Sequence, residues 1–248
     1  MPKVVISKSV GLKGVNDSGD VLKIKKRLIE LGFNWLTADD KVGPDTVSAI
    51  KLFQGIKNGF DVVVNVKNDG LVNVGGDTHR WLEAKNAPRW IKMPAGSKAE
   101  GYVNDEVADT SDNHDFGTNW LAETLRDAGA DYRDGFHNAN PKAALLRVND
   151  ASRPRGGDTP MHAGHETGLV CDIRLPRKDG GVGGITVSDA AYDRNTMRAI
   201  IKAFRKQKLA DRVLLNDPVL IGEGLCRSAA GHHNHAHFEI HPPERIDG

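Results

Sequence analysis

The chain is poor in several features that mark common protein classes. Its 248 residues include only two cysteines, Cys171 and Cys226, with no CxxC spacing, which excludes a zinc finger and a disulfide-stapled mini-fold. No window approaches the roughly eighteen consecutive apolar residues that a transmembrane helix needs. The formal net charge is only +1, so the charge balance predicts neither a nucleic-acid partner nor a membrane-surface partner.

Two further absences leave questions open. The N-terminal stretch MPKVVISKSVGLKG carries lysines but no apolar segment of the kind that a secretory signal requires. A protein with this N-terminus that works outside the cytoplasm needs another means of export or release. The two cysteines can be partly buried thiols or can form one disulfide bridge, and the sequence leaves both possibilities open.

Histidine, by contrast, is concentrated. The chain has ten histidines, and seven of them fall in two short stretches, PMHAGHETGLVCD at 160–172 and GHHNHAHFEIHPP at 231–243. These seven are His162, His165, His232, His233, His235, His237 and His241. Imidazoles gathered in this way suggest acid–base chemistry or metal binding.

The N-terminal part of the chain predicts a compact helical module. Residues 16–32 predict an amphipathic helix, because apolar residues recur at spacings of three and four. A second helix is expected to begin at 44–46 and a third after GGDT at 75–78, since Gly turns the chain and Asp or Thr can accept hydrogen bonds from a first helical turn. The sequence therefore predicts a small three-helix, all-α domain over residues 1–85.

This module resembles the peptidoglycan-binding domain that is common at one end of bacterial and phage cell-wall hydrolases. The resemblance covers roughly residues 10–84. The matching residues are Asp20, Val21, Leu28, Leu31, Gly32, Asp40, Gly43, Thr46, Ala49, Phe53, Gln54, Asp69, Gly70, Thr78, Trp81 and Leu82. Lys25 departs from the family, which usually has Gln there. The resemblance implies peptidoglycan as a partner, whereas the alternative is a generic helical module without a ligand.

The rest of the chain predicts a linker and a second domain. Residues 86–100 hold prolines, a Gly-Ser pair and charges without periodicity, which is typical of a linker. Over residues 101–248 we expect helices and short strands to alternate irregularly, which favours an α+β domain with a mainly antiparallel sheet. The expected helices are 113–128 and 193–207, and the expected strands are 143–148, 170–175, 213–215, 219–221 and 236–240.

Each histidine stretch overlaps an expected strand in the sequence. Side chains alternate between the two faces of a strand, so the last strand predicts a polar face and an apolar face. The polar face carries His235, His237, Glu239 and His241, and the apolar face carries Ala236, Phe238 and Ile240. Two imidazoles two residues apart can therefore converge on one point, although His-x-His alone is not diagnostic of a metal site.

An aspartate in the first histidine stretch strengthens the prediction of a metal site. Asp172 interrupts the apolar run LVCDIRL, where a carboxylate is costly unless it is paired, hydrogen-bonded or bound to metal. His165 precedes it by seven residues, and one histidine of the His235/His237 pair would complete a set of three ligands. Nitrogen and carboxylate ligands suit Zn²⁺, and three protein ligands with one open position are typical of a catalytic zinc site.

Other hydrolase signatures are absent. The zincin motif HExxH would need a histidine at 169, which is Leu. There is no GxSxG sequence, and neither cysteine has a local cysteine-protease signature.

The pattern H-x6-D followed by a distant H-x-H resembles the LAS metallopeptidases, which include lysostaphin-type enzymes, D-Ala-D-Ala peptidases and the zinc domain of hedgehog proteins. It is most similar to the penicillin-insensitive murein endopeptidase branch, which has an extra histidine three residues before each element. His162 and His232 occupy those places, and SRPRGG at 152–157 also resembles that branch. The resemblance covers roughly residues 110–242.

The resemblance implies a role for each of these residues. His165, Asp172 and His237 would bind zinc, and His235 would serve as the catalytic base beside the metal. His232 is the candidate for stabilising the oxyanion.

Three further residues have less defined roles. His162 either orients a ligand, contacts substrate or acts as a hydrogen-bond partner behind a ligand. Arg153 and Arg155 either bind the carboxylates of a peptide stem or lie in solvent on a surface loop.

We therefore expect an endolysin-like zinc endopeptidase that cuts peptide cross-links of the bacterial cell wall, at D-Ala–meso-diaminopimelate as the murein endopeptidase branch implies. The alternatives are an L-Ala–D-Glu endopeptidase, a D-Ala-D-Ala carboxypeptidase or a non-catalytic zinc-containing wall-binding module. We expect a monomer made in the cytoplasm that reaches the periplasm after release by a holin or a secretion machine, without inserting into a membrane.

Overall fold

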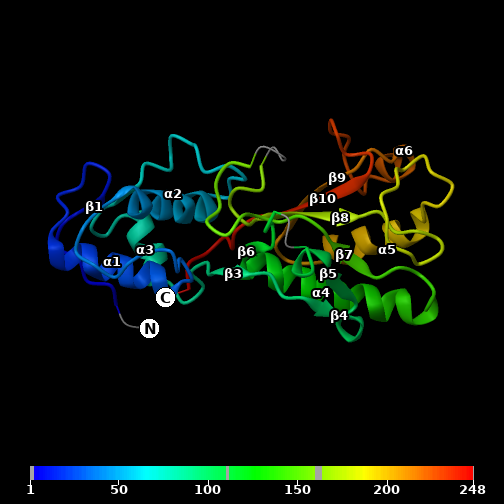
Figure 1. Ribbon diagram of the computed structural model, residues 1–248, viewed down its shortest axis with the longest axis horizontal. Helices are drawn as coiled ribbons and strands as arrows, with labels where there is room; N and C mark the ends of the chain where they lie inside the picture. The colour runs from blue at the N-terminus through cyan, green and yellow to red at the C-terminus, as the bar shows by residue number, and fades with distance from the viewer. Residues whose placement is uncertain (1–2, 110–111, 160–163, 248) are drawn as a thin grey trace.

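The computed structural model describes residues 3–109, 112–159 and 164–247, and it combines helices with three sheets (Figure 1). Helices α1, α2 and α3 lie at one end of the molecule, and the largest sheet lies at the other end with α4 and α5 (Figure 1). The first three helices span Ser18–Glu30, Pro44–Asn58 and Asp77–Glu83. All three helices of the predicted N-terminal module are therefore confirmed.

Local sequence explains where these helices begin and end. The side chain of Asp17 caps α1 by accepting hydrogen bonds from the amides of Gly19 and Asp20. Pro44 occupies the first turn of α2, where a missing amide proton costs nothing, and Gly59 ends that helix in the left-handed conformation. The module is not purely helical, because β1 (Val10–Gly11) pairs with β2 (Leu71–Val72) in a small antiparallel sheet.

A buried carboxylate anchors the N-terminal segment to α1. Asp20 accepts hydrogen bonds from the amides of Ser7 and Lys8 at 2.8 and 2.9 Å. Burial alone would raise the pKa of Asp20, but the hydrogen bonds from Ser7, Lys23 and Lys8 outweigh it and lower the pKa to about 2.

We expect Asp20→Asn to lower the free energy of unfolding by roughly 1–3 kcal/mol at neutral pH, because hydrogen bonds to a charged acceptor are lost. A carboxylate with a depressed pKa stabilises the fold at pH values above its pKa in the unfolded state. This contribution is lost as the pH falls through about 2. In urea unfolding, the variant should therefore have a lower free energy of unfolding than wild type at pH 7, and the two values should converge near pH 2. Asp45→Asn, at an exposed carboxylate of the same module, is the control.

The segment 86–100 is not a free spacer, contrary to the linker expectation. It contains β3 (Trp90–Lys92), β4 (Gly96–Ser97) and a 3-10 turn at Lys98–Glu100. Strand β3 pairs with β6 (Phe116–Thr118), and the buried indole of Trp90 donates to the carbonyl of Pro154 at 2.8 Å. Strands of two or three residues are too short to show a periodic pattern, so the sequence did not reveal them. The predicted domain boundaries themselves stay a prediction.

The largest sheet has six strands in the order β4-β5-β7-β8-β10-β9. Its neighbours are antiparallel except for β5 and β7, which are parallel, so the expectation of a mainly antiparallel sheet is confirmed. The other strands are β5 (Tyr102–Asn104), β7 (Leu146–Val148), β8 (Val170–Arg174), β9 (Ala210–Leu214) and β10 (His235–Ile240).

Helices α4 (Asn119–Gly135) and α5 (Arg194–Arg205) cover one side of this sheet (Figure 1). The apolar face of β10 packs there, and the rings of Phe238 and Phe204 lie 4.3 Å apart between centroids. The polar face of β10 is thereby directed away from this core, as the alternation of side chains along a strand requires.

One predicted helix is shifted along the chain, and one predicted strand was wrong. The helix expected at 113–128 begins only at Asn119, and Phe116 belongs to β6. The strand expected at 219–221 is a short helix, α6 (Pro218–Gly222). Asp217 caps that helix by accepting from the amides of Val219 and Leu220, and Pro218 fits its first turn. These capping residues outweigh the β-propensity of Val219 and Ile221.

Two other questions from the sequence are answered by the structure. Cys171 and Cys226 are both buried and both free, so no bridge joins them. Within the described residues, no helix is both long enough and apolar enough to cross a bilayer.

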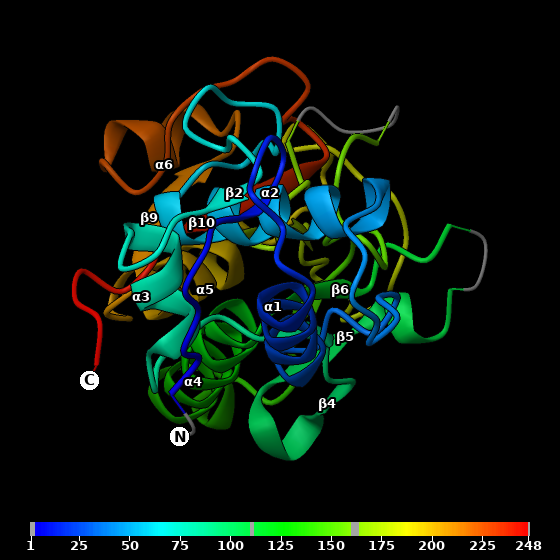
Figure 2. The same cartoon turned by 90° about the vertical axis from the view of Figure 1, so that its left-hand side faces the viewer.

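After β10 the chain returns to the N-terminal module. The carbonyl of Asp247 accepts from the amide of Lys85 at 2.9 Å, and the C-terminal segment lies beside α3 (Figure 2). The two ends of the described chain lie at the same end of the molecule (Figure 1).

Candidate metal centre

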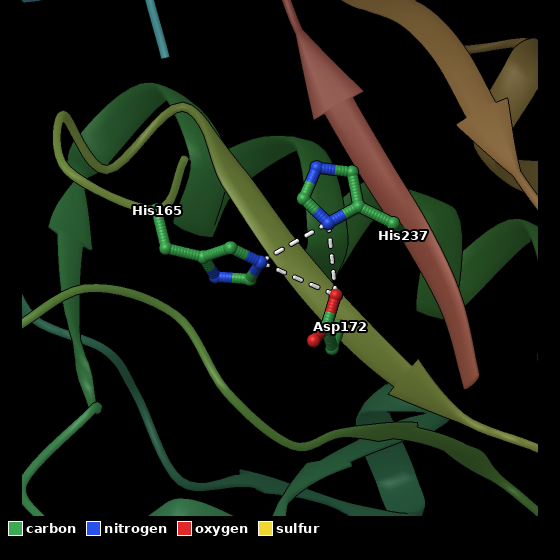
Figure 3. Close-up of side chains that lie close together, drawn as sticks. All are labelled: His165, Asp172 and His237. Carbon is green, nitrogen blue, oxygen red and sulfur yellow. Dashed lines mark hydrogen bonds and ion pairs between the residues drawn. The ribbon is translucent and has the colours of Figure 1, made fainter. Parts of the chain in front are cut away.

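Three buried side chains from distant positions in the sequence meet beside the central strands (Figure 3). Asp172 lies on β8 and His237 on β10, and these two residues are direct partners in the antiparallel register. His165 lies in the loop that leads into β8. Because partner residues on neighbouring strands project to the same face, the register brings Asp172 and His237 together, and the loop adds His165.

The distances within this triad suit a small metal ion. Nε2 of His165 lies 3.1 Å from Nδ1 of His237, and Oδ1 of Asp172 lies 3.3 and 2.9 Å from those two nitrogens. Ligands about 2.0–2.1 Å from a tetrahedral zinc ion are separated from one another by about 3.3 Å. The triad therefore presents three ligand atoms at nearly the spacing that tetrahedral coordination requires.

Neighbouring groups orient the rings of both histidines. Nδ1 of His165 lies 2.9 Å from the carbonyl of Ala151, which can only accept a hydrogen bond, so this nitrogen carries the proton. Nε2 of His237 lies 3.5 Å from Oε1 of Glu239, and Arg212 donates to the same carboxylate at 2.6 Å. Nε2 of His165 and Nδ1 of His237 are thereby the ring nitrogens that face Asp172, and such partners orient the imidazoles of metal sites.

The electrostatics of the triad favour a negative carboxylate. Burial alone would raise the pKa of Asp172, but its contacts with His165 and His237 outweigh burial and hold that pKa well below its usual range. Burial would also lower the pKa of His165, but the hydrogen bond and charge of Asp172 raise it overall. Two ring nitrogens and one carboxylate oxygen thus converge on one point, and either protons or a cation must lie between them.

The two predicted catalytic histidines lie next to the triad. His235 is half-buried, and its Nε2 lies 3.6 Å from Oδ2 of Asp172. Its Nδ1 lies 2.9 Å from the side-chain oxygen of Asn234, so Nδ1 carries the proton and Nε2 is the basic nitrogen facing the site. The ring of His232 lies 4.9 Å from that of His235 and 5.5 Å from that of His237, between centroids.

The remaining predicted residues are less closely associated with the triad. His162 lies outside the described residues. Arg153 donates to the carbonyl of Asp158 at 3.1 Å, and Arg155 lies 3.6 Å from the carboxylate of Asp45, with both side chains exposed. Neither arginine contacts the triad in the described part of the chain, so their substrate role stays a prediction.

A second group of possible ligands lies nearby. Ligand atoms of Asp112, His114 and Asp150 all lie within 4.8 Å of one another, although we gave His114 no role from the sequence. The group adjoins the triad, because the amide of Asp172 donates to the carbonyl of Asp150 at 2.7 Å. Asp112 is exposed, whereas His165, Asp172 and His237 are all buried. The buried triad is therefore the stronger candidate for a metal centre.

Sequence reasoning missed the groups that orient the ligands. The carbonyl of Ala151 leaves no trace in a sequence motif. Glu239 and Asn234 were not among the predicted site residues, yet they lie beside His237 and His235. Glu239 had a signal, because it shares the strand face of His235 and His237.

Comparison with known proteins identifies one part of the chain. A family model described as "Putative peptidoglycan binding domain" matches residues 17–61. The match covers α1 and α2 and supports the resemblance stated for the module. Residues 17–61 thus match a peptidoglycan-binding domain, and this match supports peptidoglycan as a partner. No curated protein matches the chain.

Proposed function

We propose that the protein is a zinc-dependent peptidase that cleaves peptide bonds of peptidoglycan. The observation that carries this proposal is the buried convergence of three ligand atoms, from His165, Asp172 and His237, at distances of 2.9–3.3 Å. A set of two imidazoles and one carboxylate is typical of catalytic zinc sites. When bound, zinc supplies Lewis-acid chemistry that favours the ionisation of water and polarises a carbonyl oxygen.

The histidines beside the triad supply the proton transfers. Nε2 of His235 faces the site, where it can accept a proton from the attacking water and return it to the leaving amine. Asn234 holds the ring in the required tautomer. His232, whose ring centroid lies 4.9 Å from that of His235, would stabilise the negative oxygen of the tetrahedral intermediate.

Peptidoglycan is the proposed substrate because the same chain carries a peptidoglycan-binding domain. Such a domain holds an enzyme on an insoluble wall and raises its local concentration there. The D-Ala–meso-diaminopimelate cross-link is the proposed bond, on the resemblance of the histidine pattern to the murein endopeptidase branch. An L-Ala–D-Glu endopeptidase and a D-Ala-D-Ala carboxypeptidase remain the alternatives. Action in the periplasm as a monomer is part of this proposal.

One observation favours a second candidate function. Structural zinc sites use four protein ligands, and His235, whose Nε2 lies 3.6 Å from Oδ2 of Asp172, is the candidate for the fourth ligand. The protein would then be a zinc-containing wall-binding module without activity.

Digestion of purified Gram-negative sacculi, followed by mass spectrometry of the released muropeptides, tests the proposal. We expect cross-linked dimers to give way to monomers, and we expect a chelator to abolish this and added zinc to restore it. Dimers that stay intact while the protein holds zinc tightly would favour the wall-binding alternative.

A further inference from the structure

The loop that carries His165 is attached to the peptidoglycan-binding module. This loop comprises residues 164–168, GHETG, and precedes β8. The contacting residues of the module are 60–63, which follow the end of α2, and the family match ends among them at residue 61. Figure 1 shows the end of α2 beside the chain that leads into β8.

The loop has a backbone that needs external support. His165 has a φ of 60°, in the left-handed region that residues with a side chain seldom adopt. Gly164 and Gly168, on either side, also have positive φ angles. An unusual conformation of this kind persists where the surrounding structure holds it in place.

Three hydrogen bonds join the module directly to this loop. The amide of Val63 donates to Oε2 of Glu166 at 2.6 Å, and the amide of Glu166 donates to the carbonyl of Asp61 at 3.1 Å. The hydroxyl of Thr167 donates to the carbonyl of Phe60 at 2.6 Å. The two residues that follow His165 are therefore both bonded to the module.

Close packing accompanies these bonds. Thr167 is fully buried, and its methyl group packs against Gly55 of α2. A Cβ atom added at Gly55 would lie only 3.1 Å from that methyl group. The loop is also bonded to its own domain, because the amide of Gly168 donates to Oγ of Ser152 at 2.9 Å. The loop thus lies between the two parts of the chain.

We propose that the peptidoglycan-binding module is a structural part of the metal centre, with Glu166 as a positioning residue that holds His165 in place through Val63 and Asp61. The module then does more than tether the protein to the wall. This inference rests on the proposed function in one respect, because it takes His165 to be a metal ligand.

Four variants of the full chain test the inference. Glu166→Ala removes the acceptor for Val63, Glu166→Gln keeps an acceptor oxygen without the charge, and Thr167→Val keeps the shape without the hydroxyl. Asn86→Ala is the matched control, because Asn86 makes two hydrogen bonds to the C-terminal segment, at Arg245 and Asp247, away from this loop. Zinc affinity is measured by competition with a chelating dye, and amide hydrogen exchange is measured for a peptide that covers residues 164–170.

We expect Glu166→Ala and Thr167→Val to weaken zinc binding by about 10–100-fold, the loss typical of groups that orient a ligand. Amides of the loop should exchange faster in both variants. Glu166→Gln should restore most of the affinity, which a general loss of stability would not explain. Asn86→Ala should match wild type in both measurements.

Two results would overturn the inference. One is that Glu166→Ala and Thr167→Val, folded like wild type, match Asn86→Ala in zinc affinity and in hydrogen exchange. The other is a loop that exchanges as slowly in Glu166→Ala as in wild type. If the wild-type chain binds no zinc, the proposed function fails. Faster exchange of the loop amides in Glu166→Ala than in wild type would then still support the attachment of the loop to the module.

Discussion

Replacing Asp172 with Asn is expected to remove zinc from the protein and to abolish cleavage of sacculi. The substitution keeps the shape of the side chain but takes away the negative charge on which the two imidazoles converge. Loss of a group that only orients a ligand already costs about 10–100-fold in metal affinity, so loss of the ligand itself should cost more than about 100-fold. Metal analysis after dialysis and a muropeptide digest measure the two effects.

The matched control is Asp211→Asn, which makes the same chemical change at an exposed carboxylate on β9 of the same sheet. It should keep both zinc and activity. Circular dichroism should show that both variants are folded, so that the loss of metal is not a loss of structure. An Asp172→Asn protein that retains zinc at the wild-type affinity would contradict the assignment of the triad.

His235→Ala is expected to separate catalysis from metal binding. Its Nε2 faces Asp172 from 3.6 Å and its ring is half-buried beside the triad, which suits a base more than a ligand. Removal of a general base usually lowers turnover by about 10²–10⁴-fold. We therefore expect a loss of that size in kcat, with zinc content unchanged.

His233→Ala is the comparison for this variant, because His233 is an exposed neighbour whose backbone carbonyl, not its side chain, accepts from Val187. It should cleave at close to the wild-type rate. If His235→Ala lost zinc as well as activity, His235 would be a fourth ligand, and the wall-binding alternative would gain support.

Much of the candidate site could be predicted because strands obey a simple alternation. His235, His237 and Glu239 share a face for that reason, and Phe238 packs on α5 from the other face. Asp172 was conspicuous because a carboxylate in an apolar run needs a partner. The functional roles of these residues stay predictions.

Other features could not be read from the sequence, because local signals were short or competed with one another. Strands β3 and β4 have too few residues to show a period, and the cap at Asp217 outweighed the strand-like residues that follow it. His114 stood alone in the sequence, yet folding brings Asp112 and Asp150 to it.

The sequence by itself determined the helices of the peptidoglycan-binding module, the faces of β10 and the types of residue available for a metal site. These properties follow from spacing and capping, which act over a few residues. Only the tertiary structure decided that His237 lies opposite Asp172, that Ala151 sets the tautomer of His165, and that residues 60–63 hold the loop beside it. Strand register and contacts between domains depend on how distant surfaces pack, and no local pattern encodes that.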